Sequence, residues 1–207
     1  MNLTEIVSRQ RILPIIMPNT VAQTMEDLGS YSEAGYQVLE ILCRTPHAFE
    51  TIRLGRKTFP NLQIGAGTVL TPKTADEAAE AGAQFIVSPA MDPVVSSTAR
   101  KHGLPFIPGV CTPTDMAIGM REGYTLQKFF PAEQSGGLVW INAIASPYGH
   151  TPLRLIAGSG IVRSNVASYW KNPLIAAIIA DWLVPASGEA LRKELAETRG
   201  ILPDVKN

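Results

Sequence analysis

The sequence is poor in the residues that build disulfide frameworks and metal sites. Its 207 residues include two cysteines and three histidines. Two cysteines are too few for a disulfide framework in a chain of this length. Both Cys43 and Cys111 lie in apolar runs, so we expect buried free thiols in a reducing compartment. The histidines, His47, His102 and His150, are scattered and have no carboxylate cluster at ligand spacing. The sequence therefore predicts no disulfide framework and no metal.

Net charge and long apolar segments are also missing. The chain carries 18 basic and 18 acidic side chains, and such a balance gives no general attraction to nucleic acid or to anionic membranes. The longest apolar run, from Leu174 to Ala180, has the length of a strand, well short of the roughly 20 residues of a membrane span. The first residues, MNLTEIVSRQR, lack the apolar stretch of a signal peptide. We therefore expect a cytoplasmic protein that acts on small molecules.

What the sequence does contain is a repeating unit, a short apolar run followed by a helical pattern. The runs begin at Ile12, Gln37, Leu62, Gln84, Pro105, Thr125, Leu153 and Leu174. Threonine caps, three of them followed by proline, precede four helical patterns, at Thr20, Thr45, Thr71 and Thr112. Glycines stand where four helices should end, at Gly55, Gly82, Gly103 and Gly123. Short buried strands that alternate with helices are typical of βα units on a parallel sheet.

Eight such units predict an α/β fold, a (β/α)8 TIM barrel of minimal size that spans residues 1–207 as one domain. The residues before Ile12 are expected to form a short helix that closes the bottom of the barrel. A doubly wound open sheet is the competing fold, but eight regularly spaced units favour the barrel. In a barrel, the functional residues lie at the C-terminal ends of the strands and in the loops that follow them.

Three charged residues occupy strand positions that should point into this barrel. Residues two apart share one face of a strand, so Glu40 and Arg44 point the same way while their neighbours form an apolar opposite face. The same alternation turns Lys128 inward. Buried charges are costly unless they are paired or used in function. A structural ion pair, Glu40–Arg44 or Glu40–Lys128, is therefore one interpretation.

The other interpretation is imine chemistry. An inward lysine beside Phe129, Phe130 and Pro131 would be desolvated, which favours the neutral amine of a Schiff-base nucleophile. In such a site the amine attacks a ketone, the acid moves protons, and a guanidinium binds a keto-acid carboxylate through two hydrogen bonds. An amine, a carboxylic acid and a guanidinium at one barrel mouth therefore suit a keto-acid substrate.

Two glycine-containing segments also end strands. Gly65 and Gly67 lie just before Thr68 in GAGTV, and they permit either close approach to a small ligand or a tight bend in the strand. The GSG sequence at Gly158–Gly160 is a weak motif, which could hold an anion on backbone N–H groups.

At these residues the chain resembles the 2-keto-3-deoxy-6-phosphogluconate aldolases, which often also cleave 4-hydroxy-2-oxoglutarate. The resemblance covers nearly the whole chain, in order. The matching segments are VLEILCRT (from Val38), GAGTVLTP (from Gly65), AGAQFIVSPA (from Ala81), PFIPGVCTPTD (from Pro105), KFFPAE (from Lys128) and DWLVP (from Asp181). The combination of KFFPAE with the upstream VLE…R and GAGTV is specific.

This resemblance implies a class I aldolase, a lyase that forms or cleaves a keto acid from pyruvate and an aldehyde. It implies a (β/α)8 barrel that is usually a homotrimer and uses neither metal nor cofactor. Lys128 would form the imine with pyruvate, and Glu40 would be the general acid and base. The other implied site residues are Arg44 and Thr68, which would hold the keto-acid carboxylate, and Pro89 and Phe130, which would shape the pocket.

The sequence departs from the family at the turns that bind a substrate phosphate. The TGG-type turn after strand 7 aligns with Gly158, Ser159 and Gly160, and the GGS-type turn after strand 8 aligns with Ile179-Ala180-Asp181. A carboxylate about 4 Å from a phosphate repels it by roughly 1 kcal/mol per charge pair in water, and it competes for the same N–H donors. Asp181 is alternatively an N-cap of the next helix. We expect an impaired phosphate site and an unphosphorylated aldehyde.

Two other functions fit the same residues. Oxaloacetate decarboxylation would use the same enamine, and nothing in the sequence separates it from aldol cleavage. A non-catalytic barrel that only binds a keto acid would require Lys128 or Glu40 to lie outside the pocket, and their intact motifs argue against it.

Overall fold

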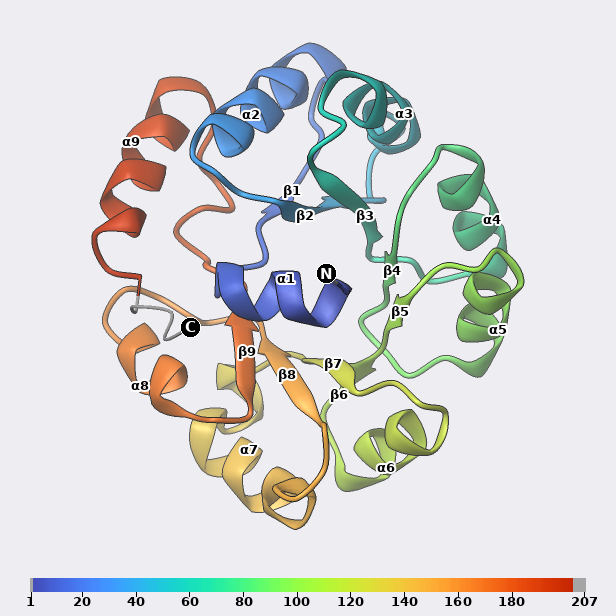
Figure 1. Ribbon diagram of the computed structural model, residues 1–207, viewed down its shortest axis with the longest axis vertical. Helices are drawn as coiled ribbons and strands as arrows, with labels where there is room; N and C mark the ends of the chain where they lie inside the picture. The colour runs from blue at the N-terminus through green and yellow to red at the C-terminus, as the bar shows by residue number, and fades with distance from the viewer. Residues whose placement is uncertain (1, 203–207) are drawn as a thin grey trace.

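The computed structural model describes residues 2–202, in which strands and helices alternate around a closed ring (Figure 1). The strands are β1 (Ile15–Ile16), β2 (Val38–Leu42), β3 (Gln63–Gly67), β4 (Ile86–Val87), β5 (Phe106–Ile107), β6 (Gly109–Val110), β7 (Leu126–Phe129), β8 (Arg154–Ala157) and β9 (Ile175–Ile178). The helices are α1 (Leu3–Gln10), α2 (Val21–Glu33), α3 (Ala48–Thr58), α4 (Pro72–Glu80), α5 (Pro93–Lys101), α6 (Pro113–Arg121), α7 (Gly137–Ala145), α8 (Val166–Lys171) and α9 (Gly188–Arg199). Short 3-10 turns, Glu133–Ser135 and Ser146–Tyr148, flank α7.

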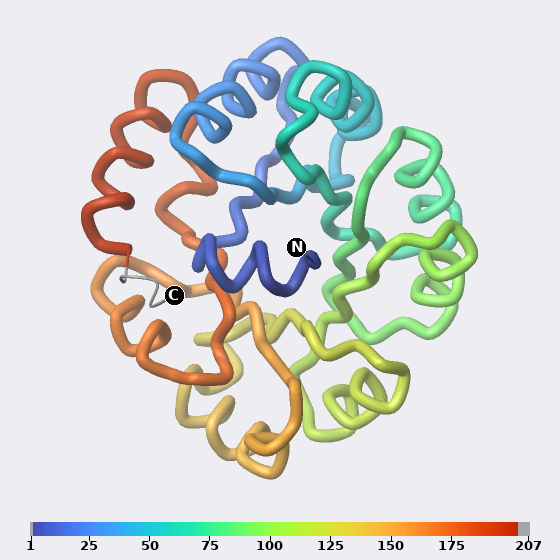
Figure 2. Tube along the Cα trace, in the orientation of Figure 1, coloured from blue at the N-terminus to red at the C-terminus, as the bar shows by residue number. Residues whose placement is uncertain are grey.

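The strands close into one barrel although they pair as two parallel groups, β1 to β5 and β6 to β9. One junction is the continuous segment from Pro105 to Val110, in which β5 pairs with β4 and β6 pairs with β7. At the other junction, the N–H of Leu13 donates to the carbonyl of Ile178 at 2.8 Å. The chain follows the ring once from end to end (Figure 2). The predicted (β/α)8 barrel is confirmed, and the open sheet is excluded because both edges are joined.

Helix α1 lies across the end of the barrel that faces the viewer in Figure 1. Its Ile6 and Val7 are buried in one apolar cluster with inward residues of the strands, among them Val38 and Leu126. The side chain of Gln10 bonds four backbone groups: it donates to the carbonyls of Ile12 and Val38, both at 2.7 Å, and accepts from the N–H groups of Gln37 and Val38. The helix therefore closes the N-terminal end of the barrel, as the sequence predicts.

The strands are buried on both faces, which produces two apolar layers. Val38 belongs to the inner cluster, whereas its neighbours Leu39 and Ile41 belong to the outer cluster between strands and helices. The alternation predicted for this strand is thus confirmed, and it places Glu40 on the inner face. The C-terminal ends of the strands lie opposite α1 and remain available for a site.

Some predicted helix boundaries are confirmed and two are wrong. Thr20, Thr71 and Thr112 accept the expected capping hydrogen bonds. Thr45 is not the N-cap of α3, because that helix starts only at Ala48 and His47 occupies the cap position. The Thr45 hydroxyl donates to the carbonyl of Pro18 and accepts from the N–H of His47. Gly55 lies inside α3, where a side chain would collide with Ile64 and Leu28.

The other predicted stops, Gly82, Gly103 and Gly123, adopt positive φ just after their helices. Both cysteines are free, but they are half-buried rather than fully enclosed. Within residues 2–202, no helix combines the length and the apolar content needed to cross a bilayer.

Candidate active site

Lys128 and Glu40 meet inside the barrel, near the C-terminal ends of β7 and β2. The Nζ atom of Lys128 lies 3.6 Å from Oε2 of Glu40, and the two residues are 7% and 0% exposed. Strand alternation brings them together, since each points inward from its strand. The sequence predicts both orientations, whereas the distance between the two side chains depends on closure of the barrel.

The Glu40 carboxylate is sealed from solvent, and no described residue hydrogen-bonds to either of its oxygens. Burial raises the pKa of Glu40 above its ordinary value, and the charges of Lys128 and Arg44 offset this only in part. Gly67 provides the room, since a Cβ there would lie 2.4 Å from Oε2 of Glu40. A Cβ at Gly65 would strike the ring of Phe85. These two glycines therefore make space for side chains of the barrel itself.

The predicted inward strand position of Arg44 is wrong, because β2 ends at Leu42 and Arg44 lies exposed in the turn that follows. Arg44 still lines the pocket that contains Lys128, whereas its neighbour Thr68 does not. The Nε atom of Arg44 donates to the hydroxyl of Thr68 at 2.9 Å. Thr68 adopts φ 56°, a left-handed conformation that is strained for a β-branched residue and that is concentrated at functional sites. The hydrogen bond uses one edge of the guanidinium and leaves its terminal N–H groups available for a carboxylate.

A pocket of about 410 Å³ surrounds the amine, a size suited to a small ligand. Its lining residues are Ile15, Leu42, Arg44, Lys128, Phe130, Ser159, Ile179, Asp181, Val184 and Pro185. Phe130 lies close to the amine, with its ring centre 5.7 Å from Nζ of Lys128. Pro89 does not line this pocket; its backbone packs against Gly109, where a Cβ would lie 2.1 Å away.

Ile15, Val184 and Pro185 are lining residues that the sequence did not single out. Ile15 is apolar, as core residues are, and Val184 and Pro185 belong to the matching DWLVP segment without a distinct chemical role. Of the three, only Ile15 could have been predicted as a lining residue, from its inward position on the first strand.

The turns after β8 and β9 are tied to each other. The N–H of Gly160 donates to Oδ2 of Asp181 at 2.7 Å, and the N–H of Asp181 donates to the carbonyl of Ile161. Ser159 adopts φ 80°, and its hydroxyl bonds Gln134 at 3.0 Å. A Cβ on Gly158 would lie 2.8 Å from Ile179. The capping alternative for Asp181 is wrong, since α9 starts at Gly188 with Ser187 before it.

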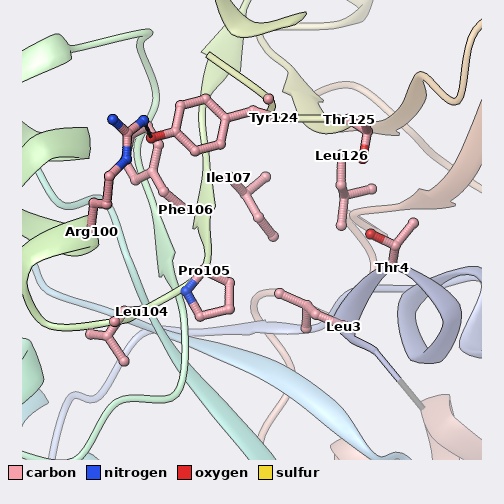
Figure 3. Close-up of a pocket in the computed structure, with 12 residues that line it drawn as sticks. Leu3, Thr4, Arg100, Leu104, Pro105, Phe106, Ile107, Tyr124, Thr125 and Leu126 are labelled. Atoms are coloured by element: carbon pink, nitrogen blue, oxygen red, sulfur yellow. Dashed lines mark hydrogen bonds between the residues drawn. The ribbon is translucent and has the colours of Figure 1, made fainter.

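A somewhat larger cavity, about 450 Å³, lies at the opposite end of the barrel. Figure 3 shows it between Leu3 and Thr4 of α1 and the starts of β5 and β7, with Arg100 hydrogen-bonded to the hydroxyl of Tyr124. Its lining contains no paired amine and carboxylate. The N-terminal face of a barrel contributes mainly to stability, so we place the candidate site at Lys128. Within residues 2–202, no three His, Cys, Asp or Glu side chains gather as metal ligands would.

Comparison with known proteins identifies the family. The family model for KDPG and KHG aldolase matches residues 3–197. The chain belongs to this family. The 2-dehydro-3-deoxy-phosphogluconate aldolase of Treponema pallidum (strain Nichols) is 36% identical over 186 residues, which cover 90% of this chain and 88% of the relative. The KHG/KDPG aldolase of Escherichia coli (strain K12) is 35% identical over 175 residues, which cover 84% and 81% of the two chains.

A solved KDPG aldolase shows the same fold. The enzyme of Legionella pneumophila, with pyruvate captured as a covalent carbinolamine, superposes with a TM-score of 0.86 at 29% identity, over 96% of this chain and 98% of that one. Members of the KDPG and KHG aldolase family are lyases, in agreement with the enzyme class that the sequence predicts.

Proposed function

We propose that the protein is a class I aldolase that forms and cleaves a carbon–carbon bond next to pyruvate, with Lys128 as the nucleophile. The observation that carries the proposal is the buried pair of Lys128 and Glu40, 3.6 Å apart. Lys128 lines the pocket, and Glu40 is sealed beside it without lining the pocket itself. Membership of the KDPG and KHG aldolase family supports it, as does the covalent carbinolamine of the Legionella pneumophila relative.

Lys128 and Glu40 can carry out each step of the proposed reaction. The Lys128 amine adds to the ketone carbon of the keto acid and forms a carbinolamine. Glu40, whose raised pKa favours the protonated acid, gives a proton to the departing hydroxyl as the imine forms. In cleavage, the same group in its carboxylate form takes the proton of the C4 hydroxyl. The bond between C3 and C4 then breaks, its electron pair enters the enamine, and the aldehyde leaves.

Arg44 and Thr68 are the groups that we assign to the keto-acid carboxylate. The terminal N–H groups of Arg44 suit a two-point hydrogen bond to a carboxylate, and Thr68 fixes the guanidinium at 2.9 Å. Phe130 borders the amine and limits access of water. Pro89 does not line the pocket. Any effect of Pro89 on the pocket shape would be indirect, through its backbone contact with Gly109.

We further propose that the aldehyde carries no phosphate. The Asp181 carboxylate occupies the N–H of Gly160, and the N–H of Gly158 bonds Phe129, so neither donor faces a ligand. A carboxylate at this place also repels a phosphate. Comparison of kcat/KM for a 2-keto-3-deoxy acid with and without its phosphate tests this, and a strong preference for the phosphorylated acid would contradict it.

The nucleophile is tested by borohydride reduction in the presence of pyruvate, followed by mass mapping. We expect one pyruvyl adduct, on the peptide that contains Lys128. Lys128→Ala should lose both the adduct and turnover while its circular dichroism spectrum is unchanged. An adduct on another lysine, or turnover that survives in Lys128→Ala, would refute the assignment.

A further inference from the structure

A second, smaller cavity adjoins the Lys128 pocket. The two spaces share Ile15, Val184 and Pro185. From there the second cavity extends between α2 and the segment that leads into α9, and its volume is about 100 Å³. Since a water molecule takes up roughly 30 Å³ in the liquid, the space suits the end of a short hydroxylated chain.

The far side of this cavity is polar. Gln23 and Asp27 line it from α2, Asn19 from the residues before α2, and Ser187 from the position just before α9. Asp27 is only 5% exposed, and aspartates are rarely so buried unless they are paired. Its Oδ1 atom accepts from the N–H of Gly188 at 2.8 Å and from Nε2 of Gln23 at 3.3 Å.

The second carboxylate oxygen of Asp27, Oδ2, has no partner among the described residues. Yet Oδ2 is not one of the sealed atoms that lack a partner. It is therefore not sealed, and Asp27 is one of the residues that line the cavity. The hydrogen bond from Gly188 to Oδ1 stabilises the start of α9 and explains the role of that oxygen. Oδ2 has no such role and can accept a hydrogen bond from a donor that enters the cavity.

We propose that this cavity, together with the Lys128 pocket on whose aldolase function the inference rests, binds the distal hydroxyl groups of the aldehyde. A carboxylate borders each space, Asp181 in the pocket and Asp27 in the cavity. Carboxylates accept hydrogen bonds from hydroxyls and repel phosphates. The chemistry therefore selects a neutral, polyhydroxylated aldehyde whose distal end lies toward the residues that the two spaces share.

The test compares two aldehydes in condensation with pyruvate: erythrose, which carries distal hydroxyls, and acetaldehyde, which carries none. Asp27→Asn keeps an acceptor for the N–H of Gly188 but removes the charge. We expect it to lower kcat/KM for erythrose about tenfold, the effect of losing one charged hydrogen bond, and to leave acetaldehyde within about twofold. Glu33→Gln, an exposed acid of the same helix, is the matched control and should change neither value.

A second variant keeps the test valid if Asp27→Asn does not fold. Asn19→Phe, at the exposed edge of the cavity, should block the space and cause the same selective loss. An equal loss with both aldehydes, or no loss with either, would show that Asp27 only stabilises α9 and would overturn the inference. Borohydride trapping of pyruvate separates the two proposals. Failure of trapping in the wild type would refute the aldolase itself, whereas each variant should still trap pyruvate.

Discussion

At the scale of residues, the unusual feature is a fully buried carboxylate whose oxygens have no hydrogen-bond donor among the described residues. Its nearest counter-charge, Lys128, lies 3.6 Å away, slightly beyond hydrogen-bond range. A buried acid in this state is destabilising by itself, and the proton-transfer role that we propose would account for its retention. Gly67 makes this possible, because any side chain there would overlap the carboxylate.

Replacement of this acid gives a prediction about rate and pH. Glu40→Gln should lower kcat by about 10²–10⁴, the usual effect of losing general acid–base catalysis, while borohydride trapping of pyruvate is only partly reduced. The wild-type pH profile of kcat/KM should contain an inflection above 4.5, since burial raises the pKa of Glu40 from that value. The inflection should be absent in Glu40→Gln; if it persists, another group titrates.

The same variant tests the direction of this pKa by stability. Because the pKa of Glu40 is raised on folding, the folded protein binds the proton more tightly than the unfolded chain. This contribution to stability is present below pH 4.5 and is lost as pH rises through the raised value. The Tm of the wild type relative to that of Glu40→Gln should therefore fall as pH increases, and a rise would contradict the assignment.

At the scale of elements, the two turns after β8 and β9 act as one unit. The Asp181 carboxylate and the N–H of Gly160 close the link between them at 2.7 Å. In our proposal, the negative charge of Asp181 and its hydrogen bond from the N–H of Gly160 both disfavour a phosphate at this place. A serine would remove the charge and release the N–H.

Asp181→Ser should accordingly shift the preference toward phosphorylated substrate. We expect the ratio of kcat/KM for the phosphorylated over the unphosphorylated keto acid to rise about tenfold or more, since a charge pair is worth roughly 1–4 kcal/mol between water and a partly buried site. Asp181→Asn, which removes only the charge, separates repulsion from competition for the donor. An unchanged ratio in both variants would mean that this turn does not meet the distal end of the substrate.

Helix α1 is the element that seals the opposite end of the barrel, and Gln10 is its main polar attachment. Gln10→Met removes the hydrogen bonds to Ile12, Gln37 and Val38 at nearly constant volume. We expect a loss of about 1–3 kcal/mol in the free energy of unfolding, measured by urea denaturation, with kcat unchanged at low temperature. Arg9→Met, at an exposed position of the same helix, is the control and should have little effect.

At the scale of the whole molecule, the barrel leaves several large apolar side chains on its surface. Leu70, Val94 and Val139 are 58%, 60% and 83% exposed. The homotrimer implied by the resemblance stays a prediction, as do the single domain and the cytoplasmic location. Light scattering after size exclusion should give three times the chain mass of 22.3 kDa, and a monomer mass would exclude the trimer.

The sequence by itself determined the eight strand–helix units and the inward orientation of Glu40 and Lys128. Both follow from local rules, since apolar runs set the strands and alternation sets the direction of each side chain. The tertiary structure decided which inward residues meet. The pairs Glu40–Lys128, Gly160–Asp181 and Asp27–Gly188 join residues far apart in the chain, and only closure of the barrel fixes their distances.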